Sequence, residues 1–84
     1  FNRLVKFINL PATCTVRIFT LAGDLVRMLE KDDANTSILD WDLENGAALP
    51  VGSGVYVYHV EAPGIGNTFG KMIVFMERET LQEF

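Results

Sequence analysis

Apolar and polar residues alternate with a period of two along most of this chain. A period of two sends successive side chains to opposite faces of an extended strand, whereas a helix repeats every 3.6 residues. Residues 14–21 give the clearest example, because Cys14, Val16 and Ile18 fall on one face while Phe19 falls on the other. The segment is also rich in β-branched residues, which favour strands. The pattern therefore predicts a half-buried strand here.

The same alternation predicts further strands, which turn residues separate. The gaps at residues 22–24 and 63–67 are short and contain glycine, so we expect antiparallel hairpins at both places. Residues 44–54 contain three glycines and a proline and are expected to form the longest loop. The predicted strands cover residues 4–10, 14–21, 25–30, 38–43, 55–62 and 68–76.

This arrangement predicts a fold class. Short strands recur about every ten residues, and no helical segment is long enough to cross over between parallel strands. We therefore expect an all-β, Ig-like antiparallel β-sandwich of six to seven strands. The sandwich is assigned to residues 1–76, and residues 77–84 to a C-terminal tail or the start of a linker.

The aromatic residues are expected to lie in the core. Trp41 and the tyrosines could form a carbohydrate platform if exposed, but their periodicity favours burial between two sheets. Either tyrosine could tie its hydroxyl back to the chain near a strand corner. The expected structural core consists of Val16, Ile18, Trp41, Tyr56 and Tyr58.

Length and charge exclude several classes of function. Seven Lys and Arg oppose eleven Asp and Glu, giving a net charge of −4, which repels nucleic acid and anionic lipid. The apolar stretches are shorter than the roughly 18 to 20 residues of a membrane helix, so no membrane span is expected. A chain of 84 residues holds one core and has little chain to wall a deep cleft, which disfavours an enzyme.

The candidate chemical features have structural interpretations. Gly70 and Lys71 follow Gly64 as in a phosphate-binding loop, but the spacing is too long by one residue and a strand follows where a helix should begin. Asp40 and Asp42, followed by Glu44, could bind calcium, yet the later EF-hand positions are wrong. We expect Asp42 to accept backbone hydrogen bonds from the turn after Trp41 instead, and we predict no cofactor and no metal.

Acid–base or nucleophilic catalysis would depend on His59 or Cys14, which are the sole residues of their types. No motif places a partner beside His59, so a surface or cross-strand role is expected. A single cysteine in a β-rich strand is typically an inert core thiol. We therefore expect no catalytic residues.

Five short motifs occur in a characteristic order, and in combination they resemble a known family. The family is that of the C-terminal Ig-like sorting domains of the bacterial type IX secretion system, with the related Ig-like domains of flagellar hook-capping proteins. The resemblance covers about residues 7–76. The motifs are Asn9-Leu10-Pro11, Leu21-Ala22-Gly23-Asp24, Trp41-Asp42, Ser53-Gly54-Val55-Tyr56 and Gly70-Lys71.

The resemblance implies a non-catalytic module at the C-terminus of a larger secreted bacterial protein. Such a module passes through the periplasm, is recognised by the outer-membrane secretion machinery, and leaves its protein secreted or attached to the cell surface. The chain begins with Phe1 rather than Met, which we interpret as a piece of a longer polypeptide. As recognition residues we select Gly70 and Lys71, within the last hairpin.

One departure favours an alternative. Sorting domains of this family usually stop just after the last strand, whereas here residues 77–84 follow. The alternative is a structural or adhesive Ig-like module of a surface protein or fibre, joined to neighbouring domains or subunits through edge strands and this tail. The candidate assembly patch consists of Phe19, Met28, Phe75, Leu81 and Phe84.

Overall fold

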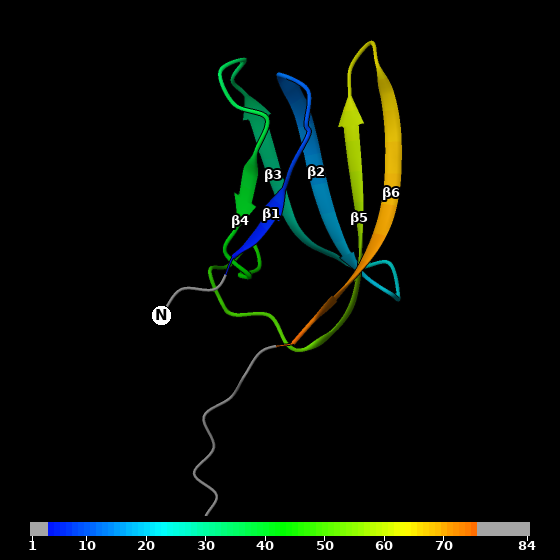
Figure 1. Cartoon of the computed structure of the whole chain (residues 1–84). Coiled ribbons are helices and arrows are strands. Elements are labelled where there is room, and N and C mark those ends of the chain that lie inside the picture. Colours follow the sequence, from blue (N-terminus) through cyan, green and yellow to red (C-terminus); the bar gives the residue numbers. More distant parts are fainter. Residues whose placement is uncertain (1–3, 76–84) are drawn as a thin grey trace, which may run out of the picture.

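The computed structural model describes residues 4–75, and all of the regular structure within them is β-strand (Figure 1). None of these residues belongs to a helix long and apolar enough to cross a membrane. The strands are β1 (Val5–Phe7), β2 (Thr13–Thr20), β3 (Leu25–Asp32), β4 (Leu39–Trp41), β5 (Gly54–Ala62) and β6 (Gly66–Val74).

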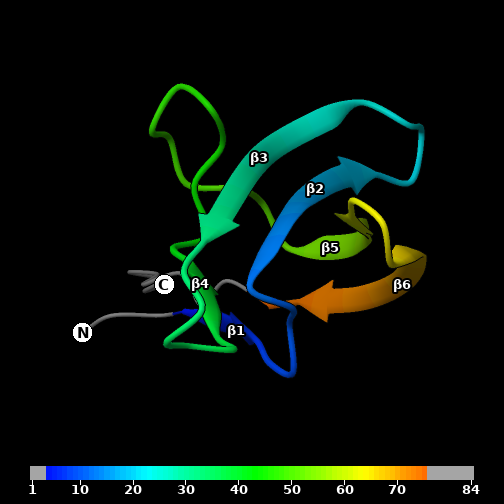
Figure 2. The same cartoon turned by 90° about the horizontal axis from the view of Figure 1, so that it is seen from above.

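The strands form two antiparallel sheets. One has four strands in the order β3-β2-β5-β6, and the other consists of β1 and β4. Seen from above, the small sheet lies against one face of the curved four-stranded sheet (Figure 2). The expected all-β, Ig-like antiparallel sandwich is confirmed, with six strands among the residues that the structure describes.

Both expected hairpins are present in the four-stranded sheet. β2 and β3 pair antiparallel across a turn in which Gly23 takes a φ of 96° and donates its amide to the carbonyl of Thr20. β5 and β6 pair across a turn in which Gly64, directly after Pro63, has a φ of 79°. Glycine adopts this left-handed region without the steric cost that a Cβ imposes, so these turns can reverse the chain tightly.

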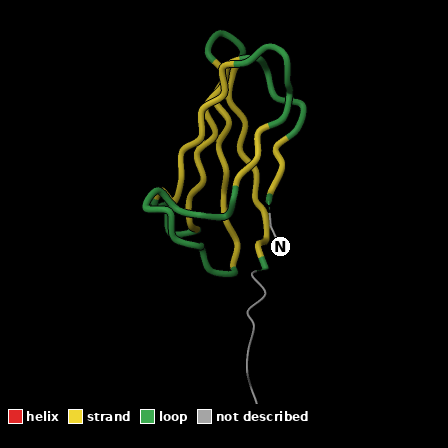
Figure 3. Tube along the Cα trace, turned by 90° about the vertical axis from the view of Figure 1, so that its left-hand side faces the viewer, coloured by secondary structure: helices red, strands yellow, loops and turns green. Residues whose placement is uncertain are grey.

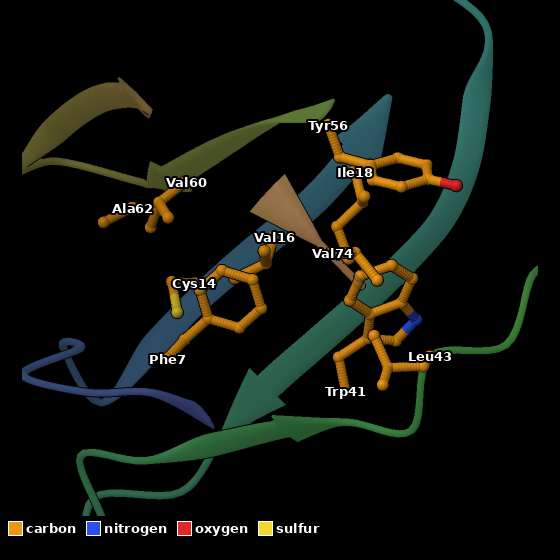
Figure 4. Packing of buried hydrophobic residues seen from close by; sticks show 10 residues of the cluster. All are labelled: Phe7, Cys14, Val16, Ile18, Trp41, Leu43, Tyr56, Val60, Ala62 and Val74. Carbon is orange, nitrogen blue, oxygen red and sulfur yellow. The ribbon is translucent and has the colours of Figure 1, made fainter. Parts of the chain in front are cut away.

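The two sheets bury a single core between them (Figure 4). Val16, Ile18 and Trp41 are fully buried, and Tyr56 is 8% exposed. Trp41 satisfies its indole N–H by donating to the carbonyl of Glu44 at 2.9 Å. Tyr58, the remaining residue of the predicted core, is half-buried and packs against the buried cluster.

The sequence predicts that one of the two tyrosines hydrogen-bonds through its hydroxyl to the backbone, and this residue is Tyr56. Its Oη donates to the carbonyl of Gly52 at 2.6 Å, four residues upstream. This bond fixes the end of the long loop against the start of β5, as in the tyrosine corner of Ig-like sandwiches. The ring itself meets Trp41 edge to face, with centroids 6.1 Å apart.

The strands of the small sheet are shorter than predicted (Figure 3). β1 ends at Phe7 rather than near residue 10, and Asn9 beyond it has a φ of 59°, which an extended strand cannot accommodate. β4 ends at Trp41 rather than residue 43, because Leu43 has a φ of 63°. Leu43 nevertheless remains buried, so its predicted place on the buried side is correct although it lies beyond the end of β4.

Candidate functional site

The two candidate recognition residues lie on opposite faces of β6. Gly70 is paired with Tyr58, whose ring belongs to the inner face of the sheet. Lys71 is paired with Val57 and is exposed on the outer face. Because neighbouring residues of a strand alternate in direction, Gly70 and Lys71 do not form a single patch on either face of the sheet.

Gly70 has a structural reason to lack a side chain. A Cβ built on its backbone would overlap the ring of Tyr58, which lies across the inner side of β6. Tyr58 in turn packs edge to face against Phe7 of the small sheet, with ring centroids 5.3 Å apart. Gly70 therefore serves the packing between the sheets.

Lys71 stands in a row of residues that crosses all four strands on the outer face. The row runs from Leu25 through Phe19 and Val57 to Lys71. Residues directly opposite each other in a sheet share a face, so this register brings the candidate recognition residue together with one candidate patch residue, Phe19. No carboxylate among residues 4–75 pairs with the Lys71 ammonium group.

The next row of the outer face contains Met28, Arg17, His59 and Phe69. His59 stacks on Phe69 with ring centroids 4.4 Å apart, and its Nε2 lies 3.2 Å from Oδ1 of Asn67. The imidazole is thus engaged across two strands. Met28, a second predicted patch residue, lies on this same face and is 47% exposed.

Arg17 organises the polar end of the same face. Its guanidinium donates to Oε1 of Glu61 at 2.8 Å. This hydrogen bond, reinforced by the positive charge of Arg17, holds the pKa of Glu61 below its ordinary value of 4.5. The outer face is therefore charged and internally paired at one end, and apolar at the other.

We call the apolar end the outer patch. Phe69 and Ile73 are its most exposed apolar members, at 69% and 65%. Phe75, predicted to belong to the assembly patch, directly follows β6 and is also exposed, whereas the predicted Leu81 and Phe84 lie outside the described residues. The outer patch consists of Phe19, Leu25, Met28, Val57, Phe69, Lys71 and Ile73.

The three residues Asp40, Asp42 and Glu44 make separate contacts and hold different partners. Asp40 pairs with Lys6 at 3.0 Å across the small sheet. Oδ1 of Asp42 accepts from Arg27 at 2.9 Å and from the backbone amide of Glu44 at 3.1 Å, which is the structural role predicted for it. The backbone carbonyl of Glu44 is itself an acceptor for Trp41 and Arg27.

Cys14 and His59 lie on opposite faces of the four-stranded sheet. Cys14 is 2% exposed and points into the core, whereas His59 is opposite Arg17 on the outer face. A groove of about 350 Å³ lies between the end of β1 and the inner side of β5 and β6. Lys6 and Tyr58 are the ionisable residues in its lining, so it holds no carboxylate or imidazole base.

Lys31 is a structural residue that the sequence analysis missed. It is 4% exposed, and its Nζ donates to the backbone carbonyls of Pro11, Ala12 and Asp33 at 2.9, 3.1 and 2.7 Å. The ammonium group thus joins the segment between β1 and β2 to the end of β3. Two of its acceptors lie about twenty residues upstream, and a polar run around Lys31 gave no sign of burial.

Comparison with known proteins gives one informative similarity. No family profile matches the sequence, and no curated protein is significantly similar to it. Among solved structures, the chain is similar to PorZ, described as an essential bacterial surface component of the type IX secretion system of Porphyromonas gingivalis. The TM-score is 0.69, with 25% identity over 84% of this chain.

The similarity links this chain to type IX secretion. It spans 9% of the PorZ chain, so it concerns one small module of a much larger surface protein. The similarity thus supports a secretion-related β-sandwich module.

Proposed function

We propose that this chain is a non-catalytic C-terminal sorting and cell-surface attachment module of a larger secreted bacterial protein. The single observation that carries the proposal is the likeness to PorZ, which combines a TM-score of 0.69 with 25% identity. The motif order of the sequence supports the same family. In this function the folded sandwich passes through the periplasm and is recognised by the outer-membrane secretion machinery.

The non-catalytic part of the proposal is supported by the placement of the reactive groups. The thiol of Cys14 is buried in the core, and the imidazole of His59 is on the other face, engaged with Phe69 and Asn67. To catalyse acyl transfer, a nucleophile must lie within hydrogen-bond reach of a base, and an oxyanion donor must face the place where the substrate carbonyl oxygen binds. These two residues are separated by the sheet itself.

The proposal is tested with a secreted fluorescent reporter that carries residues 1–84 at its C-terminus. The reporter is produced in a bacterium with type IX machinery and in a strain lacking an outer-membrane component of that machinery. A sorting module sends the reporter to the surface or medium in the first strain and leaves it in the periplasm in the second. Retention in both strains, with the domain folded, would instead favour a structural or adhesive module.

A further inference from the structure

Among the strands that the structure describes, β6 is the least protected edge strand. It has nine residues, contains no proline and carries one charge, that of Lys71. Its inner neighbour is β5, and among residues 4–75 nothing pairs with its other edge. A long, weakly charged edge presents a row of backbone donors and acceptors that a further strand can satisfy.

The opposite edge of the same sheet is protected. Four of the eight residues of β3 are charged, and the backbone amide of Gly46, in the long loop, donates to the carbonyl of Val26 in this strand at 3.0 Å. Arg27 further anchors that loop through the carbonyl of Glu44. Charges and covering loops are the usual means by which proteins prevent unwanted strand pairing. Within residues 4–75 the two edges of the sheet therefore differ: charged residues and a loop contact protect β3, and no strand pairs with the outer edge of β6.

The edges of the small sheet offer less backbone. β1 and β4 have three residues each, and their pairing with each other uses the inner edge of both. The ion pair between Lys6 and Asp40 adds charge to this sheet. β6 is thus the best template for strand addition among the described strands.

The side chains along β6 specify what an added strand should carry. On the outer face, β6 presents Phe69, Lys71 and Ile73 at alternate positions. Cross-strand neighbours stabilise a sheet when both side chains are apolar or when they carry opposite charges. Within residues 4–75 no carboxylate pairs with the ammonium group of Lys71, so β6 favours a strand that carries a carboxylate flanked at alternate positions by apolar residues.

We propose that the outer edge of β6, which no strand of residues 4–75 pairs with, binds an extended segment of a partner protein that carries apolar, acidic and apolar residues at alternate positions. The segment joins the four-stranded sheet as a fifth strand, its backbone pairs with β6, and its carboxylate lies beside Lys71. The pattern is symmetric about its centre, so it fits whether the strand runs parallel or antiparallel. Strand addition gives affinity through the backbone and specificity through alternate side chains.

The test uses the 84-residue chain and two blocked heptapeptides. Both peptides have threonine at odd positions and valine at positions two and six, and they carry either glutamate or lysine at position four. Binding is followed by amide chemical shifts and by amide hydrogen exchange. In the free chain, alternate amides of β6 are expected to exchange fast, because alternate N–H groups point away from β5.

The glutamate peptide is expected to perturb and protect the amides of β6 and to bind about three- to tenfold more tightly than the lysine peptide. The Lys71→Glu variant is expected to reverse this order, whereas Lys6→Glu, which changes an exposed lysine of the small sheet, keeps it. This reversal separates recognition by β6 from general attraction to a charged protein.

Several results would overturn the inference. Equal binding of the two peptides, no binding at millimolar concentration, or protection confined to β1, β3 or β4 would each do so. Uniformly slow exchange along β6 in the dilute free chain would mean that residues 76–84 already occupy the edge. Protection that grows with protein concentration would identify a second copy as the occupant instead.

The inference rests on the proposed function, because it names the class of partner that the module recognises. The two nevertheless fail in different ways. Export of the reporter without peptide binding would place recognition at another surface and overturn the inference alone. Peptide binding without export would support strand addition at β6 and overturn the sorting role.

Discussion

Position 70 requires glycine because the ring of Tyr58 occupies the space that a Cβ would fill. Gly70→Ala forces that ring off Phe7, so we expect the free energy of unfolding to fall by about 1 to 3 kcal/mol, the usual cost of overpacking. Gly52→Ala is the matched control, since nothing lies within 4 Å of a Cβ there. Urea denaturation measures both variants, and equal stability of the two would contradict the packing role.

Lys31 is buried and Lys6 is exposed, so the two lysines allow the effect of burial on a charged side chain to be compared. Lys31→Met removes the donor of three backbone carbonyls, and we expect a loss of about 2 to 3 kcal/mol in the free energy of unfolding. Lys6→Met breaks the exposed pair with Asp40 and should cost at most about 1 kcal/mol. Thermal or urea unfolding distinguishes the two. A cost at Lys31 no larger than at Lys6 would show that water replaces the ammonium group easily.

Glu61 offers a pH-dependent test on the outer face. Its pKa is lowered from 4.5 by the hydrogen bond and charge of Arg17, so the stabilisation is present above that value and is lost as the pH falls through the folded-state pKa. In Arg17→Met, carbon-detected NMR should show the pKa of Glu61 rising toward its ordinary value. An unchanged titration curve in the variant would refute the ion pair as its cause.

At the scale of elements, the corner between the long loop and β5 depends on one hydroxyl. Tyr56→Phe removes the donor to Gly52, and we expect the free energy of unfolding to fall by about 1 kcal/mol. For Tyr58 the structure gives no hydroxyl hydrogen bond within residues 4–75, so Tyr58→Phe should stay within about 0.5 kcal/mol of the parent. The denaturant midpoints of the two variants provide the comparison, provided that the slope of the free energy of unfolding against denaturant is unchanged. Similar losses of stability in both variants would contradict the role of the Tyr56 hydroxyl.

The elements that the sequence predicts well are those whose pattern is local. β2 alternates between buried and more exposed residues as far as Phe19, and the glycines at 23 and 64 mark the turns that join hairpin partners. β1 and β4 were predicted too long, because left-handed residues at Asn9 and Leu43 carry no sequence signal as strong as glycine.

The features that the sequence could not predict depend on register between distant segments. The pairing of β2 with β5 joins residues about forty apart and creates the rows of the outer face. Only this register brings Phe19 and Lys71 into one row, and only the pairing of β5 with β6 sets Tyr58 over Gly70. The hydrogen bonds of Lys31 to the carbonyls of Pro11 and Ala12 could not be predicted for the same reason.

At the scale of the whole molecule, the two edges of the large sheet differ in protection. β3 is charged and is contacted by the long loop, whereas β6 is long, carries part of the outer patch and has no strand on its outer edge within residues 4–75. A free-standing β-domain generally protects such an edge, because it otherwise promotes aggregation. This difference between the two edges is the basis of the proposed strand addition at β6.

The most direct measurement is the fraction of reporter outside the cell for three C-terminal fusions in a type IX-competent bacterium. The fusions carry the parent domain, Lys71→Glu and Lys6→Glu, and circular dichroism verifies that all three domains are folded. We expect the parent and Lys6→Glu to be exported and Lys71→Glu to remain in the periplasm. Equal export of all three would contradict recognition at β6, and export of none would contradict the sorting function itself.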